Sequence, residues 1–68
     1  MTDTLALRNA IKQRGLKYKY VAEKLGISPY GLQKKIENDS EFKVSEVDRL
    51  SDMLGLSLRQ KDMIFFAK

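Results

Sequence analysis

The stretch VAEKLGISPYGL, residues 21–32, contains the turn signals that decide the fold. Its first apolar residues are spaced as on one helix face, and Gly26 ends that helix because glycine tolerates the positive φ of a sharp reversal. Ser28 can accept from free amides as an N-cap, while Pro29, which has no N–H, fits the first helical position. The stretch therefore predicts two short helices joined by a tight turn, with the small Ala22 where they cross.

Apolar residues recur at helical spacing along the whole chain, and turn signals interrupt them at regular intervals. This pattern predicts one all-α domain over residues 1–68, with five short helices. The first helix begins at Thr4 as N-cap and ends before Gly15, the second covers about residues 18–25, and the third covers residues 29–38. The buried positions expected on these helices are Leu7, Ala10, Ile11, Val21, Ala22, Leu25, Leu32 and Ile36.

The second half of the chain predicts two further helices. Ser45 lies three residues before Asp48, which approximates a capping box for a fourth helix that ends at Gly55. Phe42 is the expected apolar anchor of the preceding polar connection, and Ser57 is the expected cap of a fifth helix. The fourth helix should bury Val47, Leu50 and Leu54.

Positive charge is concentrated in the first half of the chain. Residues 8–35 contain eight Lys or Arg and one acidic residue, a net charge of +7, whereas residues 36–68 contain five basic and seven acidic residues, a net charge of −2. This asymmetry is typical of a protein that binds a polyanion on one side. The alternative is that Lys serves only to keep helix surfaces soluble.

The composition argues against several other classes of protein. The chain has no Cys and no His, and Asp48 and Asp52 form an isolated pair that we expect on a solvated face. No basic segment followed by an apolar run opens the chain, and no apolar stretch approaches the roughly 18 residues that a spanning helix needs. We therefore expect a cytoplasmic protein with no catalytic site, metal, cofactor or membrane contact.

Several segments together resemble the Cro/repressor helix-turn-helix family, also called the Xre family. Residues 7–28, LRNAIKQRGLKYKYVAEKLGIS, resemble its first two helices, and residues 41–57, EFKVSEVDRLSDMLGLS, resemble its fourth. With IFFA near the end, the chain is similar to small regulators from bacteriophages and mobile elements of Gram-positive bacteria. The resemblance implies a compact five-helix, lambda-repressor-like domain with its helix-turn-helix unit at about residues 18–38.

The resemblance also implies that residues 29–38 form the recognition helix, with its N-terminal end in the major groove of double-stranded DNA. At about 100° per residue, Leu32 and Ile36 mark the inward direction and Lys34 lies opposite. Lys can donate to guanine O6 and N7, and Gln can pair with adenine. The expected base contacts are Pro29, Tyr30, Gln33 and Lys34.

A second group of residues is expected to contact phosphates. Family members commonly begin the second helix with Gln where this chain has Tyr18, so a Tyr hydroxyl would have to replace the amide. Lys35 lies at the margin of the buried face, where a buried stem and an exposed ammonium fit. The expected phosphate contacts are Lys17, Tyr18, Lys19, Lys35 and Asn38.

Four consecutive apolar residues lie near the C-terminus. One helix face cannot bury all four, and a terminal strand is the local alternative. Exposed aromatic residues on so small a domain indicate a partner surface, for a second copy or another regulator protein. The expected interface residues are Met63, Ile64, Phe65 and Phe66.

Two functions follow from these patterns. The first is a sequence-specific DNA-binding transcriptional regulator, a Cro-like or repressor-like component of a phage-type genetic switch. The second is an antirepressor or antitoxin-like module that binds another regulator protein. The second stays open because Tyr18, Pro29 and Gly31 depart from the family pattern and the second half of the chain is acidic.

Overall fold

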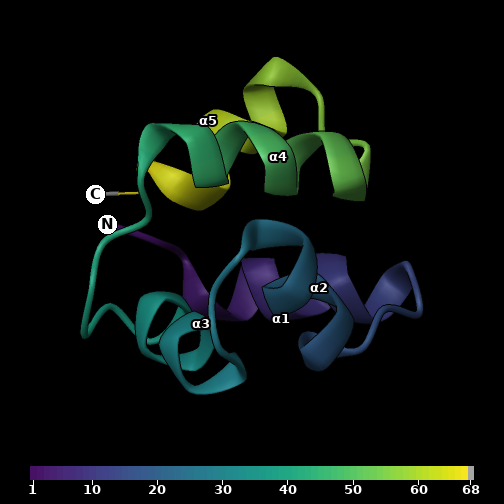
Figure 1. The fold of residues 1–68 in the computed structure, drawn as a ribbon. Coiled ribbons are helices and arrows are strands. Elements are labelled where there is room, and N and C mark those ends of the chain that lie inside the picture. Colours follow the sequence, from purple (N-terminus) through teal and green to yellow (C-terminus); the bar gives the residue numbers. More distant parts are fainter. Residues whose placement is uncertain (68) are drawn as a thin grey trace.

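The computed structural model describes residues 1–67 and contains five α-helices (Figure 1). They are α1 Thr4–Gln13, α2 Tyr18–Leu25, α3 Pro29–Ile36, α4 Val44–Leu54 and α5 Leu58–Phe65. In Figure 1, α4 and α5 lie on one side of the molecule and α1, α2 and α3 on the other, and the two ends of the described chain, residues 1–67, lie close together. The described residues include no strand, so the predicted all-α, five-helix fold is confirmed.

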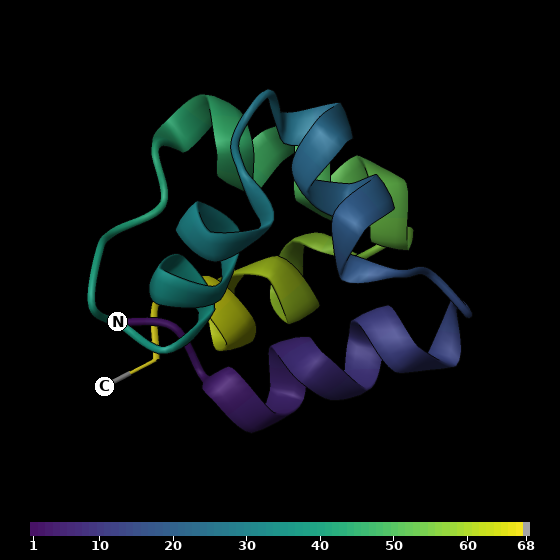
Figure 2. The ribbon, with the colours of Figure 1, turned by 60° about the horizontal axis from the view of Figure 1, so that its bottom comes forward.

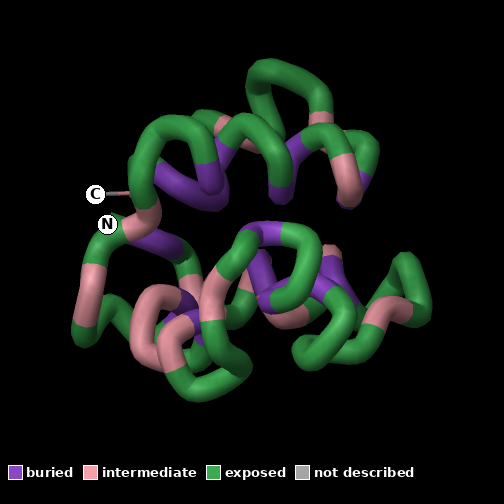
Figure 3. Tube along the Cα trace, in the orientation of Figure 1, coloured by how far each residue is buried: buried purple, intermediate pink, exposed green. Residues whose placement is uncertain are grey.

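The core lies between these two groups of helices, where the buried segments face one another (Figure 3). Its members are Leu7, Ile11, Val21, Ala22, Leu25, Leu32, Ile36, Val47, Leu50, Leu54, Ile64 and Phe65. Phe42, in the connection between α3 and α4, packs edge-on against Phe65 with 5.5 Å between ring centroids. The prediction that Phe42 anchors this connection is therefore confirmed.

Four helices end in the same left-handed turn. At the end of α2, Gly26 has φ 73° and donates to the carbonyl of Glu23 at 3.1 Å, while Ile27 donates to the carbonyl of Ala22 at 3.0 Å. These two bonds satisfy carbonyls that the helix leaves free, and Ile27 then packs against the core. The equivalent left-handed residues after α1, α3 and α4 are Gly15, Asn38 and Gly55.

Helix α3, the expected recognition helix, ends earlier than predicted. The predicted helix over residues 29–38 was two residues too long, because Asn38 has φ 66° and the helix stops at Ile36. The backbone N–H of Thr2 donates to Asn38 Oδ1, and Asn38 Nδ2 donates to the carbonyl of Thr2, both at 2.9 Å. Asn tolerates this left-handed conformation better than most other side chains, and here it also ties down the N-terminal segment.

The starts of α3 and α5 follow the sequence prediction. Ser28 Oγ accepts from the N–H of Gly31 at 2.9 Å, and Ser57 Oγ accepts from the N–H of Gln60 at 3.1 Å. Each serine satisfies one of the free amides of a helix N-terminus.

The start of α1 differs from the prediction by one residue. Asp3, not Thr4, is the N-cap, and its carboxylate accepts from the N–H of Ala6 at 3.1 Å. Thr4 is the first residue of the helix and donates its hydroxyl to the carbonyl of Ile36 at 2.6 Å. Asp3 and Thr4 can both cap a helix, but the hydroxyl of Thr4 is used in the contact with α3.

The start of α4 also differs, because the helix begins earlier than Ser45. Lys43 is the N-cap residue, and Glu46 Oε1 accepts from its backbone N–H at 2.8 Å. This is the half of a capping box that a Glu at the third helical position supplies, since a Lys side chain has no acceptor. Ser45 therefore lies inside the helix, and the predicted pairing with Asp48 was wrong.

Replacement of Asn38 should separate its two roles. Asn38→Ala removes both hydrogen bonds to Thr2 and places a Cβ in the left-handed region, so the free energy of unfolding should fall by roughly 2–3 kcal/mol. Asn38→Gly removes the same bonds but accepts the positive φ, and should be milder by about 1 kcal/mol. Urea unfolding measures both values. Equal losses in the two variants would contradict the left-handed conformation.

Candidate nucleic-acid interface

The α2–α3 pair forms a unit held by apolar contacts at the crossing of the two helices. Ala22 and Val21 of α2 and Leu32 of α3 are fully buried, and Leu25 is nearly so. A small residue at position 22 permits a close crossing, as the sequence predicts. Figure 2 shows the two helices with the turn that joins them. The outward face of each helix is therefore held in a definite place.

The start of α3 presents three of the four predicted base-contact residues to solvent. Pro29 and Gln33 are exposed, and Tyr30 is 72 % exposed. Lys34 is half-buried, although the helical angle placed it directly outward. Its ammonium lies 5.6 Å from the centroid of the Tyr30 ring, in cation–π range, because a side chain at i+4 leans back toward the residue at i.

The start of α2 lies beside a cluster of cations. Lys17, Tyr18 and Lys19 are all exposed, and no side chain caps the free amides of this helix. Arg8, Lys12, Lys17 and Tyr18 line a surface cavity of about 450 Å³. Backbone amides and cationic side chains both donate hydrogen bonds to anions, so the start of α2 offers donors of both kinds to an oxyanion.

Lys35 does not present its ammonium to solvent. Lys35 Nζ lies 2.5 Å from Glu46 Oε1, and the two side chains are only 13 % and 7 % exposed. The sequence predicted a phosphate contact for this ammonium, but in the structure it pairs with the buried carboxylate of Glu46 in the first turn of α4. Burial raises the pKa of Glu46, but hydrogen bonds from Lys35 and from the backbone of Lys43 outweigh burial and hold that pKa below its ordinary value of 4.5.

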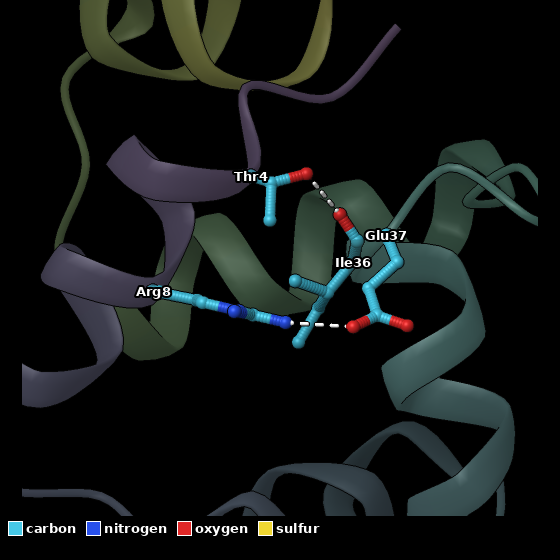
Figure 4. Close-up of polar contacts among 4 residues, drawn as sticks. All are labelled: Thr4, Arg8, Ile36 and Glu37. Atoms are coloured by element: carbon cyan, nitrogen blue, oxygen red, sulfur yellow. Dashed lines mark hydrogen bonds and ion pairs between the residues drawn. The ribbon is translucent and has the colours of Figure 1, made fainter.

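The carboxyl end of α3 is held by α1 and by the segment before it. Figure 4 shows Thr4 and Arg8 reaching the backbone of Ile36 and the side chain of Glu37. Arg8 Nη2 lies 3.0 Å from Glu37 Oε2 in a pair whose side chains are both 41 % exposed. Asn38, predicted to contact phosphate, instead uses its amide to hold Thr2.

The C-terminal apolar residues divide into two pairs. Met63 and Phe66 are 62 % and 58 % exposed, whereas Ile64 and Phe65 are buried in the core at 7 % and 4 %. Ile64 and Phe65 therefore do not belong to the predicted partner surface, because α5 continues through Phe65 and these two side chains face inward. Phe66 and Met1 line a surface cavity of about 310 Å³ next to Phe65.

Two residues with structural roles were missed by sequence reasoning. Glu46 had a local signal, since a Glu three residues after a helix start is half of a capping box. Thr2 had none, because its partner Asn38 is 36 positions away. Asp48, expected on a solvated face, is 56 % exposed and forms an ion pair with Lys61.

The helix-turn-helix family model matches residues 7–61, which include the whole of α2, α3 and α4. The chain belongs to the Cro/C1-type helix-turn-helix family. This family consists of DNA-binding regulators, and the second helix of its shared unit corresponds to α3. No curated protein and no solved structure matched the chain. Within residues 1–67, this member has no helix with the length and apolar character needed to cross a membrane.

Glu46→Gln should make the free energy of unfolding less dependent on pH in the acidic range. The substitution leaves the half-buried Lys35 ammonium without a counter-charge, so the free energy of unfolding at pH 7 should fall by about 3 kcal/mol. Because the folded pKa of Glu46 lies below its ordinary value, its contribution is complete above pH 4.5 and is lost as the pH falls through the folded pKa.

Urea unfolding from neutral pH to below pH 4.5 measures this effect. The gap between wild type and Glu46→Gln should be widest at neutral pH and narrow in acid. Glu41→Gln, which changes an exposed carboxylate nearby, is the matched control and should change stability little. A gap of constant size at every pH would contradict the ion pair.

Proposed function

We propose that the protein is a sequence-specific DNA-binding transcriptional regulator, a Cro-like or repressor-like component of a phage-type genetic switch, acting in the cytoplasm. Membership of the Cro/C1-type helix-turn-helix family is the observation that carries this proposal. The side chains of α3 support it, because the exposed Tyr30 and Gln33 offer an aromatic ring and an amide to base edges, and the half-buried Lys34 offers a cation.

In the proposed complex the start of α3 enters the major groove. Lys34 donates to guanine, Gln33 pairs with adenine, and Pro29 and Tyr30 supply apolar surface and a hydroxyl group. Glu37 does not compete for Lys34, because it pairs with Arg8. Helix α3 therefore offers few side chains for base contacts, but its cation, Lys34, is not paired with the neighbouring Glu37.

The start of α2 supplies the proposed phosphate contacts. Lys17, Tyr18 and Lys19 surround amides that no side chain caps, and phosphate oxygens accept from all of these groups. We now assign Lys35 and Asn38 to the positioning of α3, since both are held by intramolecular contacts.

The exposed pair Met63 and Phe66 supports a partner surface. A second copy is one candidate occupant, since dimeric helix-turn-helix proteins read two half-sites with two recognition helices. The same surface also favours the second candidate function, an antirepressor or antitoxin-like module, in which another regulator protein occupies it.

Selection of bound duplexes from a random library tests the proposed function against this alternative. A DNA-binding regulator should enrich one sequence from the library. A chain that enriches no sequence, yet binds a neighbouring regulator protein, would support the second candidate and contradict the first.

Binding to duplex DNA should depend strongly on salt, because each phosphate contact releases condensed counterions. Lys19→Ala should reduce the slope of log K against log salt by roughly 0.9, with similar losses on all DNA sequences. Arg59→Ala removes one exposed charge from α5, on the other side of the molecule, and should leave the slope unchanged. Fluorescence anisotropy over a salt series provides the slopes, and equal slopes for wild type and Lys19→Ala would remove Lys19 from the interface.

The two neighbouring phenylalanines should respond differently to substitution. Phe66→Ser should leave the fold intact but weaken association of the chain with itself, because Phe66 is exposed. Phe65→Ser should lower the free energy of unfolding by about 3 kcal/mol or more, because it empties a core position and buries a hydroxyl. Sedimentation equilibrium and urea unfolding measure the two effects. A wild-type chain that stays monomeric at high concentration would rule out the homodimer.

A further inference from the structure

Tyr30 and Lys34 form one unit at the start of α3. The ammonium of Lys34 lies 5.6 Å from the centroid of the Tyr30 ring, and the ring is 72 % exposed. The contact restrains two side chains that would otherwise move independently, and it leaves most of the ring open. The pair therefore presents a hydrogen-bond donor and an apolar aromatic surface side by side.

The other charged side chains of α3 and its C-cap form ion pairs with other parts of the fold. Glu37 pairs with Arg8, and Lys35 pairs with Glu46. Among the charged residues of α3 and its C-cap, Lys34 is the one that makes no ion pair within the described part of the chain. Lys34 is therefore the cation of α3 that is available to a ligand.

The chemistry of the unit matches two features of the major groove. An ammonium group donates to the O6 and N7 acceptors of guanine, and an apolar surface contacts the C5-methyl group of thymine. Both contacts must lie close together, since 5.6 Å separates the ammonium from the ring centre and successive bases rise about 3.4 Å.

We propose that Tyr30 contacts the C5-methyl group of a thymine, and that this thymine lies one or two base pairs from a guanine contacted by Lys34. This inference rests on the proposed function and names the base pairs that the same site selects. The ring surface, not the phenolic hydroxyl, is the reading group. The half-site should consequently contain a thymine and a guanine within two base pairs of each other.

Deoxyuridine substitution tests the proposal directly, because it removes the methyl group and keeps every hydrogen-bonding group of thymine. The duplex is the one that wild-type protein enriches from a random library, and its thymines are replaced one at a time. One thymine per half-site should weaken binding about fourfold when replaced, which corresponds to the roughly 0.8 kcal/mol of one buried methyl-sized group. Replacement of the other thymines should change binding much less.

Variants assign the effect to the ring. Tyr30→Phe should keep the deoxyuridine effect, and Tyr30→Ala should abolish it. Tyr20→Ala is the matched control, because Tyr20 is also an exposed ring with the ammonium of a lysine four residues later, Lys24, at 5.5 Å. That control should keep the effect, and thermal unfolding confirms that all three variants are folded.

Three results would overturn the inference while the proposed function stands. They are an enriched duplex in which no thymine is sensitive, a sensitivity that survives in Tyr30→Ala, and a sensitivity lost in Tyr30→Phe, which would assign the reading to the hydroxyl. Failure of the wild-type protein to enrich any sequence is a different result. It would overturn the proposed function itself, and this inference with it.

Discussion

The placement of α3 depends on contacts at its carboxyl end. A helix of two turns is not stable alone, because nucleation costs more than so few hydrogen bonds return. Leu32 and Ile36 seat the helix in the core, but they fix only one face. Its end is then held by the hydroxyl of Thr4, by the Arg8–Glu37 pair and by the amide of Asn38. At the opposite, amino-terminal end, Pro29, Tyr30 and Gln33 present their side chains to solvent.

The same contacts decide which positive charges are available for binding. Residues 8–35 contain eight basic side chains, of which Arg8 and Lys35 form ion pairs with Glu37 and Glu46. Six basic side chains of that segment form no ion pair within residues 1–67. Glu37 and Glu46, both from the acidic second half of the chain, thus form ion pairs that hold α3 in place. The basic side chains that are available for binding and those that form ion pairs within the fold are therefore different residues.

Most of the fold could be predicted from the sequence because its signals are local. The left-handed turn at Gly26, the Ser28 cap and the apolar spacing from Val21 to Leu32 all act within a few residues. The errors come from contacts that no local pattern contains. Lys35 meets a carboxylate on another helix, and Asn38 leaves the helix to hold a residue near the start of the chain.

The candidate site was predictable in outline but not in its details. The exposed face of α3 follows from helical periodicity, and three of its four expected base-contact residues are exposed. The lean of Lys34 over Tyr30 depends on rotamers, which periodicity does not specify. The two phenylalanines near the end show the same limit, because only the packing of α5 against the core decides that Phe65 is buried and Phe66 exposed.

The central claim is that DNA meets this protein at the starts of α2 and α3. The most direct test is a two-dimensional amide NMR titration of the isotopically labelled chain with a short duplex that it has selected. The account predicts that the largest chemical-shift changes fall on residues 17–20 and 30–34, with small changes along α5. Large changes confined to Met63 and Phe66, or no changes in α2 and α3 at saturating duplex, would contradict it.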